Sequence, residues 1–320
     1  MVSVAKKDQD REITRQDIDR VLEAAQSAAL PSDREILHAI PQDFIVDEQG
    51  GISDPLGMLG SRLEVAVHLV TGNITRRKTL LTCINRAGIE VIELIFEPLA
   101  TAEAVLTHDE RELGALLLDI GSGTTEYAVF GDGEVQHSAV LPVGAGHFTN
   151  DLAMVLRTPF AEAEQIKVKH GCCLTGMVGE EEGISVPTVA GGPARVVPKK
   201  ELCGILQPRA EEMLTLVRED LAKYGFDEAL RGGLVLTGGG AQLDGYLELA
   251  EQVFNCTVRY GLPQGLGGLV DVISSPTWTA ASGLLLYGRS SEDRHRKTVN
   301  TGFSVRGVVT SLRGMFSDLL

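Results

Sequence analysis

The sequence lacks the features that mark membrane-spanning, secreted or nucleic-acid-binding proteins. No run of about 18 apolar residues occurs, and the N-terminal MVSVAKKDQDRE has no apolar signal region, which excludes a spanning helix and a secretory signal. The formal net charge is −15, and no basic stripe of the kind that binds nucleic acid is present. We therefore expect a cytoplasmic protein without a nucleic-acid partner.

Cysteine is scarce and irregularly spaced. The five cysteines follow neither a CxxC pattern nor a spacing with histidine that would bind zinc: Cys83, Cys172, Cys173, Cys203 and Cys256. An odd number also fits poorly with a framework of disulfides. We expect all five to be reduced and structural.

Two common phosphate-binding signatures are absent, although two glycine-rich turns are present. No Lys-Ser or Lys-Thr pair follows the glycines, and no acidic residue stands about 20 positions beyond them, which excludes a P-loop and a dinucleotide fingerprint. In LLLDIGSGTTEYAVF, an apolar strand ends at Asp119 and is followed by Gly121, Ser122, Gly123 and Thr124. In RGGLVLTGGGAQL, a second strand precedes Gly238, Gly239 and Gly240, with a helix predicted to begin near Ala241.

Either turn alone is also compatible with an ordinary hairpin or a plain strand-to-helix turn. Glycine lets a ligand approach the backbone, and consecutive bare N–H groups bind anions. A carboxylate at a strand end, here Asp119, can hold magnesium through water. Two such turns, about 115 residues apart, can close on one phosphate-bearing ligand from opposite sides.

The remaining sequence alternates helices with strands, which predicts an α/β protein. Residues 1–73 combine a helix capped by Thr14 and Asp17 with strands REILHAI, DFIVD and RLEVAVHLV, and so predict a small αβ subdomain. A helix over 74–87, the strand IEVIELIF and a helix over 98–106 follow.

Residues 159–230 are predicted to be an insertion between the two glycine turns. They contain the helix PFAEAEQIKVKHG, a variable glycine-rich and acidic stretch, and a long helix from Pro198 to about Tyr224. Arg209, Glu211 and Glu212 lie near the middle of the long helix, where exposure to solvent is the ordinary interpretation. A role in ligand binding requires that this helix border a cleft.

The C-terminal segment differs in composition from the rest. Residues 289–302, RSSEDRHRKTVNTG, are predicted to be a flexible linker. Residues 303–320 predict an amphipathic helix with one apolar arc of roughly 140°, formed by Val305, Val308, Val309, Leu312, Met315, Phe316, Leu319 and Leu320. Such a face packs on its own core, in a lipid interface or in a partner's groove, and the linker favours the last two.

Taken together, these segments resemble the FtsA family of bacterial cell-division proteins, part of the actin/Hsp70/sugar-kinase ATPase superfamily. The resemblance is carried by ILHAIPQDFIVDEQGGISDPLGMLGSRLEVAVHLVT, EPLATAEAVLTHDERELGALLLDIGSGTTEYAVF, AEAEQIKVKHGCC, LVLTGGGAQLDG and the terminal helix. It implies an actin-like ATPase fold with two lobes around a nucleotide cleft and the inserted subdomain at 1–73. The first lobe would comprise 74–112 and 273–288, and the second 113–158 and 231–272, with the insertion at 159–230.

The resemblance also implies ATP and Mg²⁺ as ligands. The second phosphate loop would consist of Asp119, Gly121, Ser122, Gly123 and Thr124, with Asp119 on the magnesium side. Gly238, Gly239 and Gly240 would form the adenosine motif, with Arg209 and Glu212 beside the base. The first interdomain connection would contain Gly144, Gly146, Asn150 and Asp151. The second would contain Ala280 and Gly283. Glu126 stands where relatives keep a residue that positions water. An outward side chain on an alternating strand is at least as good an interpretation of Glu126. The resemblance therefore implies at most weak hydrolysis of ATP.

The implied function is that of a scaffold. Such a protein would tether the FtsZ ring to the inner face of the cytoplasmic membrane at the division site, self-associate into actin-like polymers and recruit later division proteins. A metabolic kinase or chaperone-like ATPase of the same superfamily is an alternative, and would need a substrate base in the cleft. A scaffold for pili or cell shape is another, and would lack the DPLGMLGSRLEV subdomain.

In one respect the sequence departs from the family pattern. Relatives begin with an earlier glycine-bearing turn, the first phosphate loop, and this sequence starts after it. The sequence is therefore expected to be a fragment, to have a misassigned start, or to lack half of one nucleotide-binding subdomain. In the last case we expect exposed apolar sheet edges and weak ATP binding.

Overall fold

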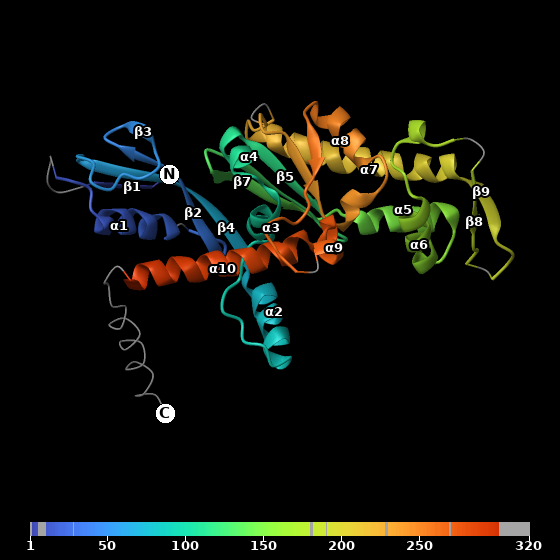
Figure 1. The fold of residues 1–320 in the computed structure, drawn as a ribbon, viewed down its shortest axis with the longest axis horizontal. Coiled ribbons are helices and arrows are strands. Elements are labelled where there is room, and N and C mark those ends of the chain that lie inside the picture. Colours follow the sequence, from blue (N-terminus) through green and yellow to red (C-terminus); the bar gives the residue numbers. More distant parts are fainter. Residues whose placement is uncertain are drawn as a thin grey trace.

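A computed structural model describes residues 2–5, 11–27, 29–179, 182–189, 191–227, 230–268 and 270–300. Three parts follow one another along the long axis of the molecule: a small subdomain, a central sheet with its helices, and a helical region with a hairpin (Figure 1). The predicted terminal helix at 303–320 lies outside the described residues. In the part of the chain that is described, no helix is both long and apolar enough to cross a bilayer.

The small subdomain is a four-stranded antiparallel sheet covered by one helix. The strand order is β1 (Val2–Ala5), β4 (Arg62–Asn73), β2 (Arg34–Val46) and β3 (Gln49–Ile52), with α1 (Arg15–Gln26) packed on it. The predicted cap of α1 is confirmed, because the Thr14 backbone N–H and hydroxyl both donate to Asp17 Oδ2, at 2.9 and 2.6 Å. The two predicted strands REILHAI and DFIVD form the single strand β2, whose pairing with β4 shifts register on either side of Pro41.

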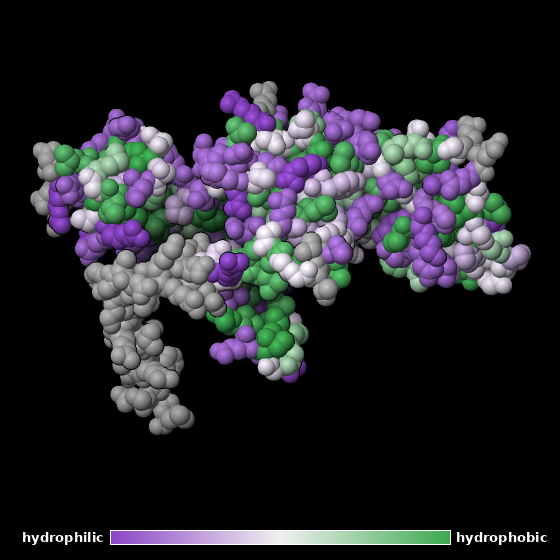
Figure 2. Space-filling model, in the orientation of Figure 1, coloured by the Kyte–Doolittle hydropathy of each residue, from purple (hydrophilic) through white to green (hydrophobic). Residues whose placement is uncertain are grey.

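The segment after the small subdomain contains one confirmed helix and one wrong prediction. The predicted helix is α2 (Ile74–Arg86), but residues 89–96 do not form the predicted strand. A strand needs a neighbour for its backbone groups, and none of the described strands pairs with this segment. Ile92 is 97% exposed and Ile89 60% exposed, and Leu80 of α2 is 51% exposed. The apolar surface over α2 and the chain beside it is visible in Figure 2.

The central sheet contains the glycine turns. Its order is β11 (Val258–Tyr260), β10 (Leu234–Thr237), β5 (Ala115–Ile120), β6 (Thr125–Gly131) and β7 (Glu134–Leu141). β10 is parallel to β5 and β11, whereas β5, β6 and β7 are antiparallel. Every residue of β5 is buried, including Asp119, and the apolar run before Asp119 predicts a buried strand.

Helices cover both faces of this sheet. On one face, Leu116 and Leu118 pack with side chains of α5 (Ala145–Leu156), α7 (Lys199–Lys223) and α8 (Tyr246–Phe254). On the other face, Leu117 and Val235 pack with α3 (Glu97–Val105) and α10 (Thr279–Asn300). The helix predicted over 98–106 is thus α3, and α4 (His108–Leu113) follows it.

The insertion is more regular than its sequence predicts. The predicted first and long helices are α6 (Phe160–His170) and α7, and the apolar face of α7 is buried at Leu202, Leu206, Met213, Val217 and Leu221. A short turn, η1 (Thr175–Met177), follows α6. Between it and α7, the stretch expected to be variable forms an antiparallel hairpin of β8 (Gly183–Val186) and β9 (Arg195–Pro198).

Two predicted boundaries in the last third of the chain were wrong. The helix expected near Ala241 is only a 3₁₀ turn, η2 (Gly239–Gln242), and α8 begins at Tyr246. The expected linker at 289–302 is helical as far as Asn300, as a continuation of α10, which follows α9 (Val270–Ile273) and η3 (Pro276–Trp278). No glycine or proline interrupts residues 289–300, so nothing in the local sequence ends the helix there.

Candidate functional site

The two glycine turns lie side by side because the strands that lead into them are parallel neighbours. In the β5–β10 pair, Asp119 stands opposite Thr237, so both strands end at the same edge of the sheet. Gly238 has a φ of +87°, and a Cβ there would overlap Asp119 Oδ1 and lie 2.5 Å from the Ile120 carbonyl oxygen. Glycine is therefore required where the second turn crosses the end of the first strand.

The N-terminus of α5 packs directly against the first turn. The backbone N–H of Ala145 donates to the Gly121 carbonyl at 2.9 Å, and that of Gly146 donates to the Ser122 carbonyl at 2.7 Å. A Cβ on Gly144 would lie 2.7 Å from both of these carbonyl oxygens. Gly144 and Gly146, predicted to belong to an interdomain connection, thus hold the first turn in place.

Two glycines of the turns, Gly123 and Gly239, face open space. A Cβ on Gly123 would meet no atom within 4 Å, and one on Gly239 would meet only Thr277 Oγ1, at 3.9 Å. These two backbone positions can be approached by another molecule without displacing a side chain of the described chain.

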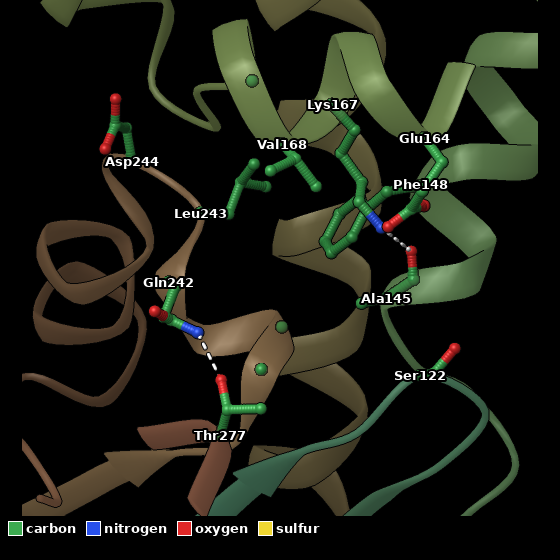
Figure 3. Close-up of a pocket in the computed structure, with 13 residues that line it drawn as sticks. Ser122, Ala145, Phe148, Glu164, Lys167, Val168, Gln242, Leu243, Asp244 and Thr277 are labelled. Carbon is green, nitrogen blue, oxygen red and sulfur yellow. Dashed lines mark hydrogen bonds and ion pairs between the residues drawn. The ribbon is translucent and has the colours of Figure 1, made fainter. Parts of the chain in front are cut away.

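A pocket of about 550 Å³ adjoins both turns (Figure 3). The first turn contributes Ser122, and the second contributes Gly239 and Gly240. The other lining residues come from α5, α6, η2, η3 and the segments that follow α6 and η2. They are Ala145, Phe148, Glu164, Lys167, Val168, Gly171, Gln242, Leu243, Asp244 and Thr277. The pocket therefore combines bare backbone, apolar side chains and a few polar groups, as ligand sites commonly do.

Lys167 is the cationic side chain of the pocket, and the sequence analysis missed it. Its Nζ lies 2.7 Å from Glu164 Oε2 and donates to Thr149 Oγ1 at 2.9 Å and to the Ala145 carbonyl at 3.2 Å. Burial acts to raise the pKa of Glu164, but hydrogen bonds from Lys167 and Thr149 and the charge of Lys167 together lower it below its usual value. The spacing of Glu164 and Lys167, three residues apart on a helix, was the available signal.

Three carboxyl groups gather beside the first turn. Asp119 stands opposite Glu126 in the antiparallel β5–β6 pair, and the charge of Glu97, at the start of α3, acts on both. Burial, then repulsion from Glu97, raises the pKa of Asp119 to about 7. The same causes, with Asp119 added, raise the pKa of Glu126 to about 7. Glu97 is more exposed, but the surrounding protein raises its pKa too.

This carboxyl group cluster shows where positive charge would be stabilised. Glu126 is half-buried, and its Oε2 is buried without a hydrogen-bond partner among the described atoms. Its side chain is thus not the freely solvated one that an outward position on a strand would give. Neither Asp119 nor Glu126 lines the 550 Å³ pocket, although Ser122 and Gly123 lie between them in the chain.

The structure places Arg209 and Glu212 away from this pocket. Arg209 binds Asp151 of α5 through Nε at 2.7 Å and through Nη2 at 3.1 Å, and also pairs with Glu212 one turn along α7. Neither Arg209 nor Glu212 is among the residues that line the pocket. Their contacts join α7 to α5.

The predicted second interdomain connection is a close helix crossing. Gly283 of α10 lies directly against the Ala100 carbonyl of α3, and a Cβ there would overlap it. Ala280, one turn earlier, is half-buried. The small residues of PTWTAASG thus allow α10 to pack tightly on α3.

Comparisons with known proteins connect this arrangement with one family. The family model for "Cell division protein FtsA" matches residues 116–283, and that for the SHS2 domain inserted in FtsA matches residues 1–71. The chain is 44% identical over 279 residues to FtsA of Pseudomonas aeruginosa, covering 87% of this chain and 67% of the relative. It is 38% identical over 320 residues to FtsA of Escherichia coli strain K12, covering 96% of this chain and 76% of the relative.

Solved structures of lower identity share the fold. MreB5 of Spiroplasma citri bound to ADP superposes with a TM-score of 0.57 at 19% identity, over 72% of this chain and 69% of that one. The PilM–PilN type IV pilus biogenesis complex gives a TM-score of 0.61 at 16% identity, over 90% and 76%. The predicted α/β, actin-like ATPase fold with an inserted small αβ subdomain is therefore confirmed.

Proposed function

This chain belongs to the FtsA family of cell-division proteins, and from that membership we propose that it is an ATP-binding, actin-like scaffold. In this proposal it tethers the FtsZ ring to the inner face of the cytoplasmic membrane at the division site, self-associates and recruits later division proteins. The observation that carries the nucleotide part is the meeting of two glycine turns, on parallel strands, at one 550 Å³ pocket.

The residues of the pocket fit a nucleotide. Gly239 in the pocket and Gly123 in the adjoining turn leave room for phosphate groups beside the backbone, and Lys167, paired with Glu164, places a cationic group on the wall. Phe148, Val168 and Leu243 supply apolar surface for a base. Solved structures of the fold relative MreB5 contain ADP or AMPPNP, which supports a nucleotide here.

A magnesium ion fits beside Asp119. No group of three or more His, Cys, Asp or Glu side chains in the described ranges is arranged to hold a metal directly. Magnesium keeps several waters and binds through one or two carboxylates plus phosphate oxygens, so a single aspartate suffices. A bound cation would supply charge neutralisation for the phosphates and would lower the raised pKa of Asp119. Glu126, beside it, is the residue we assign to orienting water in a weak ATPase activity.

The membrane part of the proposal concerns residues 303–320. α10 leads the chain from the pocket to its last described helical residue, Asn300, and the predicted amphipathic segment follows. Residues 1–73, the SHS2 subdomain, are the part we assign to contacts with neighbouring molecules.

Co-sedimentation with anionic liposomes tests the tether. We expect the intact chain to bind, and deletion of residues 303–320, or Leu312→Asp with Phe316→Asp, to abolish binding without lowering the Tm of the remaining protein. Thr310→Asp with Ser317→Asp is the matched control, because it adds the same charge to the predicted polar face. Binding that survives the deletion, or a large loss of Tm in the Leu312/Phe316 variant, would contradict the proposal.

Calorimetric titration with MgATP tests the nucleotide part. We expect binding by the intact chain, and weaker binding by Asp119→Ala in a protein that remains folded. Unchanged affinity in Asp119→Ala would show that the first turn is only a hairpin.

A further inference from the structure

Two short 3₁₀ turns meet at the edge of the pocket. Gln242, the last residue of η2, donates from Nε2 to Thr277 Oγ1 of η3 at 2.8 Å (Figure 3). Ser275 Oγ also approaches Gln242 Oε1, at 3.4 Å. Gln242 and Thr277 both line the pocket and are exposed, so a molecule that fills the pocket must contact this bridge.

A second, buried link lies behind the bridge. Thr237, at the end of β10, is fully buried, and its Oγ1 lies within hydrogen-bond distance of Thr279 Oγ1, at 3.0 Å, and of the Gly261 carbonyl oxygen, at 3.1 Å. Thr279 is the first residue of α10. The Thr279 hydroxyl donates in turn to the buried Pro276 carbonyl of η3, at 2.8 Å. The buried side of η3 and the start of α10 are thus held at one enclosed point, whereas the exposed side of η3 is joined to η2 only by contacts of Gln242, which a ligand can replace.

α10 is long enough to carry a small movement over a large distance. Its residues Thr279–Asn300 span ~33 Å, at about 1.5 Å per residue. It runs from the pocket toward the small subdomain (Figure 1), and its contact at Gly283 with the Ala100 carbonyl couples it to α3. A rotation of about 5° at its first turn would move its far end by roughly 3 Å.

We propose that the Gln242–Thr277 bridge is a latch through which a nucleotide in the pocket sets the orientation of α10. The ligand competes for Gln242, the exposed side of the η3 turn at Thr277 is released, and α10 pivots on the buried Thr237–Thr279 link. The state of the pocket then reaches the C-terminal residues that follow α10. This inference rests on the proposed nucleotide site.

Trp278 provides a built-in probe of the latch. It is the only tryptophan of the sequence, it follows Thr277 directly, and it is 46% exposed. We expect MgATP to change the acrylamide quenching constant of Trp278 in the intact chain by about twofold, because release of the η3 turn alters the exposure of the ring.

Thr277→Val removes the hydroxyl while preserving the side-chain shape. Because this variant is already unlatched, we expect its Trp278 quenching without nucleotide to match that of the ligand-bound parent, with little further response. Linkage requires the same variant to bind MgATP more tightly, by about two- to tenfold, since the ligand no longer breaks a hydrogen bond. Thr277→Ser should behave like the parent. Thr79→Val, an exposed threonine on α2, is the matched control for the substitution itself.

The outcomes separate this inference from the proposed function. If MgATP binds the parent but Thr277→Val keeps the parent's Trp278 response and affinity, the latch is refuted and the nucleotide site stands. Weaker MgATP binding in a folded Thr277→Val would also refute the latch, because the hydroxyl would then be assisting the ligand. If MgATP does not bind the intact chain, both proposals fail.

Discussion

Replacing Asp119 with asparagine should stabilise the protein above neutral pH while weakening the binding of magnesium nucleotide. Asp119 is only 7% exposed, and its pKa is raised to about 7 by burial and by repulsion from Glu97. Its charge therefore costs stability in the folded state at neutral pH. Asparagine keeps the shape of the side chain and removes that charge, so the free energy of unfolding should rise.

The magnitude and the pH window follow from the pKa. The carboxyl ionises at a pKa of 3.8 when unperturbed and at about 7 in the fold, a difference of about 3 units or, at 1.36 kcal/mol each, about 4 kcal/mol as an upper limit. Between these values the folded state binds more protons than the unfolded state, so this group destabilises the parent increasingly as pH rises. The gain in Asp119→Asn is thus absent below about pH 4, grows to pH 7 and is constant above it.

Thermal unfolding at pH 5 and pH 8 tests this prediction. We expect Asp119→Asn to raise the Tm at pH 8 by roughly 5–10 °C and to raise it much less at pH 5. MgATP should no longer add stability to the variant. Asp19→Asn, an exposed aspartate on α1, is the control and should change the Tm little. A lower Tm at pH 8, or an equal gain at both pH values, would refute the assignment of Asp119 as a destabilising carboxylate kept for its ligand.

The remaining predictions concern single contacts. Gly144→Val should lower MgATP affinity about tenfold or more in a titration, because the valine side chain would collide with the Gly121 and Ser122 carbonyls. Normal affinity would exclude a role for the first turn in nucleotide binding. Lys167→Met should lower MgATP affinity about tenfold, because the cationic group of the pocket wall is removed. It should also lower the Tm, because the ion pair with Glu164 and the hydrogen bonds to Thr149 and Ala145 are lost; unchanged affinity in the folded variant would contradict a role in binding. Burial, then repulsion from His137, lowers the pKa of His68, so the neutral histidine is favoured in the fold and its contribution to stability is lost as the pH falls below 6.5. His68→Gln should therefore remove this part of the pH dependence of Tm. An unchanged profile of Tm against pH would contradict the prediction.

The parts of the fold that the sequence predicts well are those fixed by local pattern. The apolar run that ends at Asp119 predicts the buried strand β5, and the Thr14–Asp17 cap specifies the start of α1 without any distant contact. The segment 89–96 has an equally good strand pattern but finds no ladder partner among the described strands. Strand formation depends on a neighbour, so a local pattern is insufficient there.

The C-terminal part of α10 shows the opposite error. Its charged residues after Gly288 lack an apolar periodicity, which favoured a linker, yet they continue a helix whose first turns are anchored on α3. Helix propagation needs only one residue to be ordered at a time once a nucleus exists. The packed nucleus at Gly283 is a tertiary feature, and a sequence window over 289–300 does not contain it.

The candidate site divides in the same way. The backbone elements were found because glycine turns after apolar strands are local signals, and the parallel pairing of β5 with β10 brings them together. The positions of side chains relative to the pocket are harder to predict, because they depend on partners distant in sequence. Arg209 is neutralised by Asp151, 58 residues earlier, and so joins two helices, whereas Lys167 reaches the pocket through the packing of α6 on α5. Glu97 similarly affects Asp119 only because the fold brings the start of α3 near the end of β5. Charge in this pocket is therefore set by tertiary contacts, and the Lys167→Met and Asp119→Asn variants probe contacts that the sequence alone does not display.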